Sequence, residues 1–478
     1  MTSHDLVIVG SGSGNSIADG AFAQSSVAII DGGTFGGTCL NVGCIPTKMF
    51  VYPGDVTSLI RDDASALGLR GDQPTADWPA IRDRIFSRVD SISAAGKEWR
   101  QAGAANTTLY DQPAKLVSPK TLRLADGTEI TADSLVLAAG SRPVLPEITG
   151  LNEADVYDPM IPVHTSDTIM RLDRLPERLV VVGSGYVASE FAHIFSAYGV
   201  DVTQIARSGA LLRHFDHDIA KGFTQRAGTY WRVLTETNTM TVRASCTSVE
   251  VGVCDRDGVR TTLAADALLV ATGRKPNSDT LGLAKAGYDL EPDGRLSVDT
   301  YQRVLSGGRP VAGVFGLGDL SSPFQLKHVA NHEAKVVRHN LLDPSQLWES
   351  DHRFVPAVVF SHPQVAAVGL TEEQARQTGR PVVTAIHPYA SVAFGWAMAQ
   401  DEETGGFAKV IADAETGDLL GAHILGAQAS ILIQPIVTAM SFGIPARTMA
   451  RGQYWPHPAL SEVVENALLS LSLSAGAR

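Results

Sequence analysis

Hydrophobic residues occur in short continuous runs that are followed by glycine-rich turns. The first run, at residues 5–9, leads into GSGSG, then into a segment with helix-like spacing, and then into a second run that ends at Asp31. Continuous apolar runs between glycines are typical of strands buried on both faces of a parallel sheet. The pattern predicts a strand, a glycine turn, a helix and a second strand, the opening unit of a dinucleotide-binding domain.

The same order of elements returns in LVVVGSGYVASEFAHIFSAYGV, followed by DVTQIAR. This repeat predicts two mononucleotide-binding units, and hence two nucleotides. Further strand-plus-glycine segments occupy residues 134–143, 267–277 and 311–320. From about residue 351, strands and helices alternate without a glycine fingerprint, and the chain finishes with a helical apolar pattern.

At 478 residues the chain exceeds the size of one hydrophobic core, so we expect several domains. The predicted fold is α/β, with two Rossmann-like nucleotide-binding domains and a C-terminal α+β dimerisation domain. We place the first domain at residues 1–155, the second at 156–275, a returning part of the first at 276–347, and the interface domain at 348–478.

Composition narrows the classes of partner. The formal charge is −12 and no basic cluster occurs, so we expect no binding to nucleic acid. No secretory signal and no apolar run that could span a bilayer are evident, which predicts a cytoplasmic protein without a membrane anchor. Four cysteines are too few for a disulfide framework. In a reducing compartment, a close cysteine pair points to catalysis or metal binding.

The first glycine turn contains Gly10, Gly12 and Gly14, and Asp31 follows at the end of the next strand. Such a turn lets the backbone approach a pyrophosphate, while the carboxylate binds ribose hydroxyls. Asn15 occupies the position that usually holds the last glycine, so the motif is imperfect.

The second turn contains Gly183, Gly185 and Ala188, and alanine is accepted at the third position. Its second strand ends at Arg207, where an NAD site would carry an acid, and Arg213 follows. Guanidinium groups bind phosphate well, so these arginines favour the 2′-phosphate of NADPH. The alternative is that both are solvated surface residues.

Cys39 and Cys44 lie in GGTFGGTCLNVGCIPTK. In a regular helix, five residues rise by about 7.5 Å, whereas disulfide-bonded Cα atoms lie roughly 4.4–6.8 Å apart. The pair can therefore close only where the helix is distorted. A metal site would need further ligands, and Cys246 and Cys254 have no histidine at ligand spacing. We therefore favour a redox pair over a metal site or two inert thiols.

His457-Pro458 precedes the last predicted helix, and Glu462 follows five residues after the histidine. Proline suits a first helical turn, so we expect His457 just outside the helix with Glu462 reaching back to its imidazole. That arrangement orients one ring nitrogen and leaves the other available for proton transfer. A simple capping role is the alternative, but a nearby dithiol favours acid/base chemistry.

Together these motifs are recognisable. GGTCLNVGCIPTK, the two fingerprints, the ATG segment, GLGDL and HPALSE resemble the FAD-containing pyridine-nucleotide disulfide oxidoreductases, in order and along the whole chain. Within that family, HTSDTIMRL, LKHVANHEA, FGWAM and ARGQYWPHPALSEVVENALL look most like the mycothione reductase subfamily. Ala459 departs from the threonine common in the last motif.

The resemblance implies a role for each matching position. Tyr186 matches the aromatic gate over the flavin, and Lys48 with Glu190 matches the ion pair beside flavin N5. Cys39 matches the interchange thiol, Cys44 the charge-transfer thiol, and His457 with Glu462 the acid/base dyad. The implied FAD contacts are Gly10, Gly12, Gly14, Asp31, Thr38, Lys48, Gly140 and Asp319. The implied NADPH contacts are Gly183, Gly185, Tyr186, Ala188, Arg207, Arg213 and Gly273.

The family further implies an obligate homodimer whose active site is shared between subunits. The predicted activity is the reduction of a small thiol disulfide, mycothione, by NADPH. A dihydrolipoamide dehydrogenase is the main alternative, although Arg207 disfavours it. Mercuric reductase is disfavoured because no N-terminal metal-binding cysteine pair and no cysteine after Cys254 occur. A non-catalytic flavoprotein redox sensor is the alternative from another class.

Overall fold

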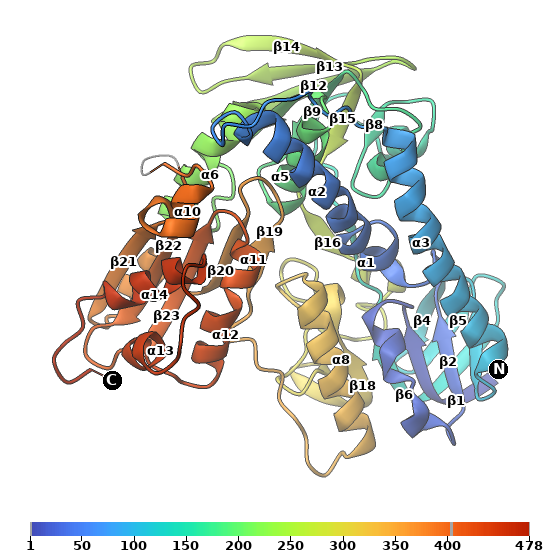
Figure 1. The fold of residues 1–478 in the computed structure, drawn as a ribbon. Coiled ribbons are helices and arrows are strands. Elements are labelled where there is room, and N and C mark those ends of the chain that lie inside the picture. The colour runs from blue at the N-terminus through green and yellow to red at the C-terminus, as the bar shows by residue number, and fades with distance from the viewer. Residues whose placement is uncertain (1, 402–404, 478) are drawn as a thin grey trace. The chain divides into compact units, whose positions relative to one another are not determined.

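The computed structural model describes residues 2–401 and 405–477. The chain forms two compact units, which are coloured by residue number in Figure 1. Unit 1 contains residues 1–47, 82–144 and 273–352, and unit 2 contains residues 48–81, 145–272 and 353–478. Helices α2 (Cys44–Ser58) and α3 (Trp78–Glu98) each continue from one unit into the other. Each unit is thus assembled from three separate stretches of sequence.

Unit 1 is built on a mainly parallel sheet in which β1 lies between β6 and β2. Leu6 and Ile8 of β1 pack on one face with residues of α8 (Lys327–Leu342). Val7 and Val9 pack on the other face with residues of β4 (Ala114–Ser118) and β5 (Thr121–Leu124). Burial on both faces explains the uninterrupted apolar run. The strands are β1 (Thr2–Val9), β2 (Val27–Ile30), β3 (Thr107–Tyr110), β4 (Ala114–Ser118), β5 (Thr121–Leu124), β6 (Glu129–Leu137), β17 (Arg303–Ser306) and β18 (Arg309–Gly316), with a separate pair β7 (Ser141–Pro143) and β16 (Arg274–Pro276).

The helices of unit 1 include one correction to the sequence prediction. The segment after the first glycine turn is not one α-helix but two short 3₁₀-helices, because glycine, serine and asparagine there are weak α-helix formers. Asn15 also bonds elsewhere, since its side chain and carbonyl accept hydrogen bonds from Arg100. The helical segments are η1 (Ser13–Ile17), η2 (Gly20–Phe22), α1 (Gly37–Asn41), η4 (Trp99–Gly103), α7 (Ser278–Leu281), η6 (Gly318–Leu320) and α8 (Lys327–Leu342).

Unit 2 contains a second parallel sheet in the order β11-β10-β9-β15-β8. A three-stranded antiparallel sheet of β12, β13 and β14 packs on one face through a shared apolar cluster. Helix α5 is buried over most of its length, which explains its apolar sequence. The elements are α4 (Glu153–Tyr157), β8 (Val163–His164), η5 (Ile169–Arg171), β9 (Arg178–Val182), α5 (Tyr186–Ala197), β10 (Asp201–Ile205), α6 (His217–Tyr230), β11 (Arg232–Leu234), β12 (Asn238–Ala244), β13 (Val249–Cys254), β14 (Arg260–Ala265) and β15 (Ala267–Val270), preceded by η3 (Leu59–Asp63).

The rest of unit 2 is an antiparallel sheet in the order β19-β20-β23-β22-β21, covered by the C-terminal helices. This α+β arrangement agrees with the predicted fold of the last domain. Its strands are β19 (Ala357–Val359), β20 (Val365–Gly369), β21 (Val382–Pro388), β22 (Phe407–Asp413) and β23 (Leu419–Leu425). Its helices are α9 (Glu372–Gln377), η7 (Tyr389–Ser391), α10 (Ala393–Ala397), α11 (Ala429–Leu432), α12 (Gln434–Ser441), α13 (Ala446–Arg451) and α14 (Ser461–Leu469).

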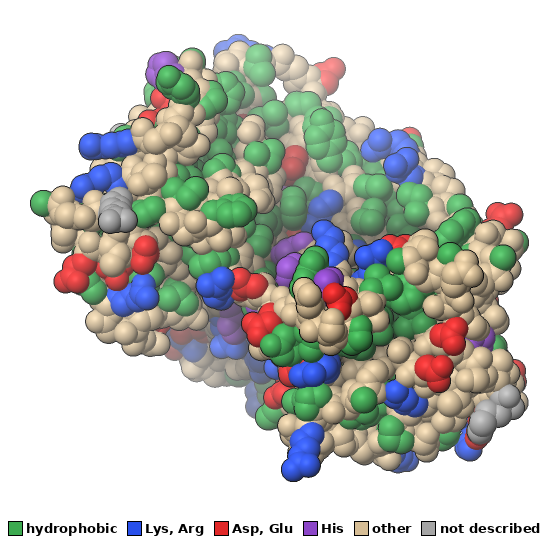
Figure 2. Space-filling view, turned by 90° about the horizontal axis from the view of Figure 1, so that it is seen from below, with side chains coloured by type: hydrophobic (Ala, Val, Ile, Leu, Met, Phe, Trp, Pro, Cys, Tyr) green, Lys and Arg blue, Asp and Glu red, His purple; other side chains and the backbone are tan. Residues whose placement is uncertain are grey.

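The surface carries both signs of charge. On the face shown in Figure 2, Lys and Arg side chains are scattered among Asp and Glu side chains. Across residues 2–401 and 405–477, no helix combines the length and the apolar composition needed to cross a membrane.

Candidate functional site

The two motif cysteines lie on either side of a break between two helices. Cys39 belongs to α1, and Cys44 is the first residue of α2. A Cβ on Gly43 would lie 2.8 Å from the Thr38 carbonyl oxygen and 3.2 Å from Cys39 Cα. Only glycine therefore lets the intervening turn pack this closely against Cys39. The helix is interrupted at the place that the cysteine spacing requires.

The Cys39 and Cys44 side chains are thiols that are hydrogen bonded to each other. This hydrogen bond, followed by burial, raises the pKa of the Cys39 thiol well above its ordinary value, although the Lys327 charge partly opposes the shift. Cys44 is exposed at the start of a long helix, where the helix dipole favours a thiolate. The pair is therefore asymmetric, and Cys39 requires a base before it can attack a disulfide.

The segment before Cys39 also contacts the first glycine turn. A Cβ on Gly37 would lie 2.9 Å from Gly12 Cα, so the two backbones touch. Asn41 stabilises this segment, because its amide nitrogen donates hydrogen bonds to the carbonyl oxygens of Phe35 and Gly37 at 3.0 Å each. The dithiol and the first glycine turn are thus parts of one local structure in unit 1.

The first glycine turn fits a dinucleotide. Gly10 has a φ of +108° and a Cβ there would lie 2.3 Å from the Ala138 carbonyl oxygen, so that position tolerates only glycine. A Cβ on Gly12 would meet only Gly37 Cα, at 4.0 Å, so the turn is crowded on that side alone. Asp31 accepts hydrogen bonds from the backbone N–H groups of Ser11 and Gly33 at 2.7 and 2.8 Å. Its carboxylate keeps lone pairs that can accept bonds from ribose hydroxyls.

Asp319 lies in η6, just after β18, and is held by a polar network that the sequence did not reveal. Its carboxylate accepts a hydrogen bond from the Ser141 hydroxyl at 2.6 Å, and that hydroxyl accepts one from Arg274 at 2.8 Å. The preceding Gly318 donates its N–H to Glu333, which is buried on α8. Glu333 could have been identified from the sequence as an acidic residue on the apolar face of a helix. Gly140 and Gly273 both adopt positive φ, next to the paired strands β7 and β16.

Lys48 and Glu190 form a well-packed ion pair in unit 2. Lys48 Nζ donates to both carboxylate oxygens of Glu190, at 2.8 and 2.6 Å, and the Glu190 side chain is only 6% exposed. Glu190 also accepts the N–H of Phe360 at 3.0 Å, and Lys48 Nζ lies 5.0 Å from the centre of the Phe360 ring. A charge pair of this kind fixes the lysine, because charge-assisted hydrogen bonds are stronger than neutral ones. Phe360 was not identified from the sequence.

The second glycine turn has the geometry of the predicted nucleotide site. Gly183 has a φ of +142°, and a Cβ there would lie 2.2 Å from the Ala271 carbonyl oxygen. Gly185 precedes α5 and has open space where a Cβ would stand, so a pyrophosphate fits at the helix N-terminus. Ala188 is fully buried against Gly183. The structure thus combines a tight turn with an accessible helix start.

Tyr186 and the two arginines lie around this turn. Tyr186 begins α5, and its ring is 5.3 Å from the ring of Phe215. Arg207 follows β10 and Arg213 lies on the next turn, and both side chains are exposed. That turn contacts the fingerprint, because Leu212 donates its N–H to the Ser184 carbonyl at 2.7 Å.

His457 and Glu462 are hydrogen bonded, with His457 Nδ1 donating to Glu462 Oε1 at 2.7 Å. The prediction that Pro458 lies in the first turn of the last helix is wrong, because α14 begins at Ser461 and residues 457–459 form a bend. The bend is held by the Ala459 N–H, which donates to Glu462 Oε2 at 2.9 Å. That bond, followed by the one from His457, lowers the pKa of Glu462. The carboxylate therefore stays charged and orients an imidazole that is 74% exposed.

The predicted site residues divide between the two units. Among the described residues, no group of three or more His, Cys, Asp or Glu side chains has the geometry to hold a metal ion. Unit 1 contains Gly10, Gly12, Gly14, Asp31, Thr38, Cys39, Cys44, Gly140, Gly273 and Asp319. Unit 2 contains Lys48, Gly183, Gly185, Tyr186, Ala188, Glu190, Arg207, Arg213, His457 and Glu462.

Comparison with known families identifies the class. Residues 4–334 match the pyridine nucleotide-disulphide oxidoreductase family, and residues 355–468 match the dimerisation domain of the same family. The chain belongs to this family, as the sequence motifs predicted. It is therefore an NAD(P)H-dependent flavoprotein disulfide reductase, with FAD and NADPH as its cofactors.

Individual relatives give a finer comparison. Mycothione reductase from Mycobacterium tuberculosis is 49% identical over 98% of this chain and 100% of its own length. Dihydrolipoyl dehydrogenase from the same organism is 31% identical, covering 98% of both chains. Mercuric reductase from Staphylococcus aureus is 31% identical over 98% of this chain and 82% of its own. The Cu(II) complex of the HOCl-induced flavoprotein disulfide reductase RclA from Escherichia coli has a TM-score of 0.83 at 26% identity, covering 98% of this chain and 99% of that one.

Proposed function

We propose that the protein reduces mycothione, a disulfide of a low-molecular-weight thiol, with NADPH. The overall reaction consumes one NADPH, one proton and one disulfide, and yields NADP⁺ and two thiols. The observation that carries the proposal is the 49% identity to mycothione reductase along the whole chain, against 31% for the dihydrolipoyl dehydrogenase and mercuric reductases. The asymmetric Cys39–Cys44 pair supports the chemistry.

The proposed mechanism assigns the proton steps to named side chains. Bound FAD would supply the redox step, by accepting hydride from NADPH and passing two electrons to the Cys39–Cys44 disulfide. Cys39, whose pKa is raised, then gives its proton to His457 and attacks the substrate disulfide. His457 returns a proton to the first departing thiol. Cys44 attacks the mixed disulfide at Cys39, its thiol proton passes to the departing sulfur, and the second thiol leaves as the internal disulfide re-forms.

The remaining assignments concern position and specificity. Lys48, held by Glu190, would lie beside the flavin, and Tyr186 would cover the nicotinamide site until the nucleotide binds. Arg207 and Arg213 would bind the 2′-phosphate. The family's dimerisation domain supports a homodimer, in which we place the His457–Glu462 dyad at the dithiol of the other subunit. The domain boundaries near residues 155, 275 and 347 and a cytoplasmic location stay predictions.

The deciding experiment compares substrates. The purified protein, loaded with FAD, is mixed with NADPH and, in parallel, mycothione, glutathione disulfide, lipoamide or Hg²⁺, and NADPH oxidation is followed. We expect turnover with mycothione only, abolished by Cys39→Ser with retention of FAD. Turnover with lipoamide and NAD would favour a dihydrolipoamide dehydrogenase, and near wild-type turnover by Cys39→Ser would disprove the dithiol mechanism.

A further inference from the structure

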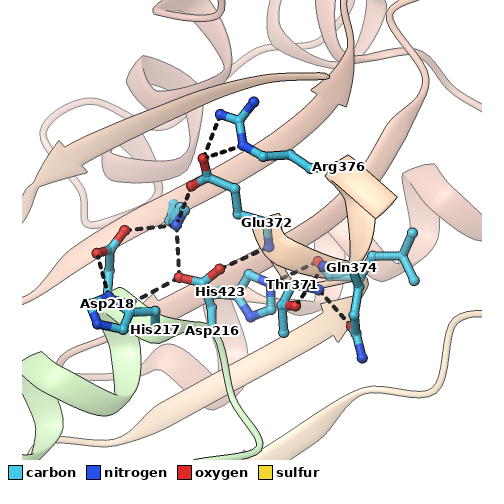
Figure 3. Close-up of polar contacts among 10 residues, drawn as sticks. Asp216, His217, Asp218, Thr371, Glu372, Gln374, Arg376 and His423 are labelled. Atoms are coloured by element: carbon cyan, nitrogen blue, oxygen red, sulfur yellow. Dashed lines mark hydrogen bonds and ion pairs between the residues drawn. The ribbon is translucent and has the colours of Figure 1, made fainter. Parts of the chain in front are cut away.

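Lys409 is a lysine buried in the C-terminal part of unit 2 and surrounded by three carboxylates. Its Nζ lies 2.8 Å from Asp216, 2.7 Å from Asp218 and 2.7 Å from Glu372, and its side chain is 2% exposed. Lys409 belongs to β22, Glu372 begins α9, and the two aspartates lie at the start of α6. Figure 3 shows the three carboxylates converging on one point. We name this group, Asp216, Asp218, Glu372 and Lys409, the Lys409 cluster.

The charge of Lys409 is needed to balance its neighbours. Burial disfavours the charged form, but the bonds to Asp216, Asp218 and Glu372 outweigh it and raise the pKa of Lys409 above its ordinary value. His423, on the neighbouring strand β23, lies opposite Lys409, and burial lowers its pKa, which favours the neutral imidazole. Arg376 bonds only the outer oxygen of Glu372, at 2.6 Å. Lys409 is therefore the cation that holds Asp216.

Asp216 accepts hydrogen bonds from three different structural elements. One carboxylate oxygen accepts the Asp218 N–H at 3.1 Å, which caps α6, and also contacts Lys409. The other oxygen accepts the Glu372 N–H at 3.0 Å. Asp216 is thus held by donors from α6, α9 and β22, and it is 2% exposed.

The residues just before Asp216 form the turn that carries Arg213. Phe215 is buried against Tyr186, and Leu212 is buried with a φ of +52° and is bonded to Ser184. A branched residue at positive φ is strained, so surrounding contacts must hold it there. The exposed Arg213 lies between these two anchors. The position of the turn therefore depends on Ser184 at one end and on Asp216 at the other.

We propose that Lys409 is a positioning residue for the NADPH site. It fixes Asp216, and through Asp216 it fixes the turn that presents Arg213 to the 2′-phosphate and supports the Tyr186 ring. This inference rests on the proposed roles of Arg213 and Tyr186. It gives the C-terminal domain a part in recognising the nucleotide, in addition to dimerisation.

The test uses two variants of the full-length, FAD-loaded protein and one matched control. Lys409→Met removes the central charge, and Asp216→Asn keeps a capping oxygen for α6 while removing the charge that Lys409 holds. Arg376→Gln is the control, because it breaks an ion pair to Glu372 from a side chain that is 57% exposed and leaves Lys409 in place. The readouts are kcat and KM for NADPH and for NADH, and the rate at which disulfide reoxidises dithionite-reduced enzyme.

We expect both cluster variants to raise the KM for NADPH by roughly 2- to 30-fold, the range seen for residues that act through others. The rise should be smaller for NADH, which lacks the 2′-phosphate that Arg213 would bind. Reoxidation by disulfide should not change, since it does not use the nucleotide. The control should retain the wild-type KM for both nucleotides.

Three results would overturn the inference. An unchanged KM for NADPH in either folded variant would show that the cluster does not position the turn. Equal losses with NADPH and NADH, or a parallel loss of disulfide reoxidation, would show a purely structural role. If Lys409→Met does not fold, Asp216→Asn decides alone. If the wild type reduces none of the tested disulfides, the proposed function fails. The inference can then still be tested, because titrations followed by flavin absorbance compare the affinity of wild type and variants for NADP⁺.

Discussion

His164 gives the clearest prediction for the pH dependence of stability. It ends β8 in the second parallel sheet, and its Nδ1 lies 3.2 Å from the Thr168 hydroxyl. Burial lowers the pKa of His164 from 6.5 to about 4. Between pH 6.5 and about pH 4, the unfolded chain therefore carries a proton on this imidazole, whereas the folded chain does not. Stability contributed by the neutral imidazole is complete above pH 6.5 and is lost as the pH falls towards 4.

The size of this effect follows from the two pKa values. Between pH 8 and pH 5, linkage through this one group removes about 2 kcal/mol from the free energy of unfolding. His164→Asn keeps a polar atom that can bond Thr168 but cannot titrate, so it should escape this loss. Any cost of the substitution that does not depend on pH cancels when the two conditions are compared.

The assay is urea unfolding of wild type and His164→Asn at a fixed protein concentration, followed by far-ultraviolet circular dichroism from pH 8 to pH 5. Relative to wild type, the variant should gain about 2 kcal/mol on going from pH 8 to pH 5. His164→Gln serves as a second non-titrating variant and should show the same change relative to wild type. A constant difference for His164→Asn would refute the assignment of a half-buried, neutral imidazole.

Two further predictions concern the dithiol and the ion pair. Gly43→Ala places a methyl group 2.8 Å from a carbonyl oxygen. We therefore expect a loss of about 1–3 kcal/mol of stability, measured by thermal release of FAD. We also expect slower disulfide reduction, measured by turnover. Gly228→Ala, on an open helical surface, should instead be neutral or slightly stabilising, and equal losses in both variants would contradict the packing argument. Glu190→Gln removes the charge that holds Lys48. The loss of a charge-assisted bond worth about 1.5–3 kcal/mol should slow flavin reduction by NADPH roughly tenfold or more. An unchanged rate in stopped-flow absorbance would show that the pair is not needed for that step.

The sequence was most informative where a local pattern has one structural solution. Gly10 and Gly183 both adopt positive φ, and both lie against a neighbouring strand end where a Cβ cannot fit. The His457–Glu462 bond was also predictable from spacing, although the helix start was placed too early. The α-helix expected after Gly12 was wrong, because a general motif does not account for the weak helix propensity of the residues present.

Contacts between distant segments could not be predicted in the same way. Lys409 and Asp216 are 193 residues apart, and nothing in the local sequence of either indicates a buried ion pair. A lysine in the apolar strand FAKVIAD was the available signal, because a charged residue is almost never fully buried unless it is paired. The partner, however, is determined by how β22, α6 and α9 pack together. Glu333 on α8 is a second case of this kind.

Two polar contacts join α2, the helix that begins at Cys44, to α5. Lys48 bonds Glu190 on α5, and Asp55 bonds His193 one turn further along the same helix, at 2.8 Å. Burial lowers the pKa of His193, so the second contact is a bond between a carboxylate and a neutral imidazole. Removing Glu190 leaves the charge of the 32% exposed Lys48 without its counter-ion, whereas removing His193 takes away a neutral donor and no charge. The alignment of α2, which starts at Cys44, therefore depends more on Glu190 than on His193, and function should be more sensitive to the first.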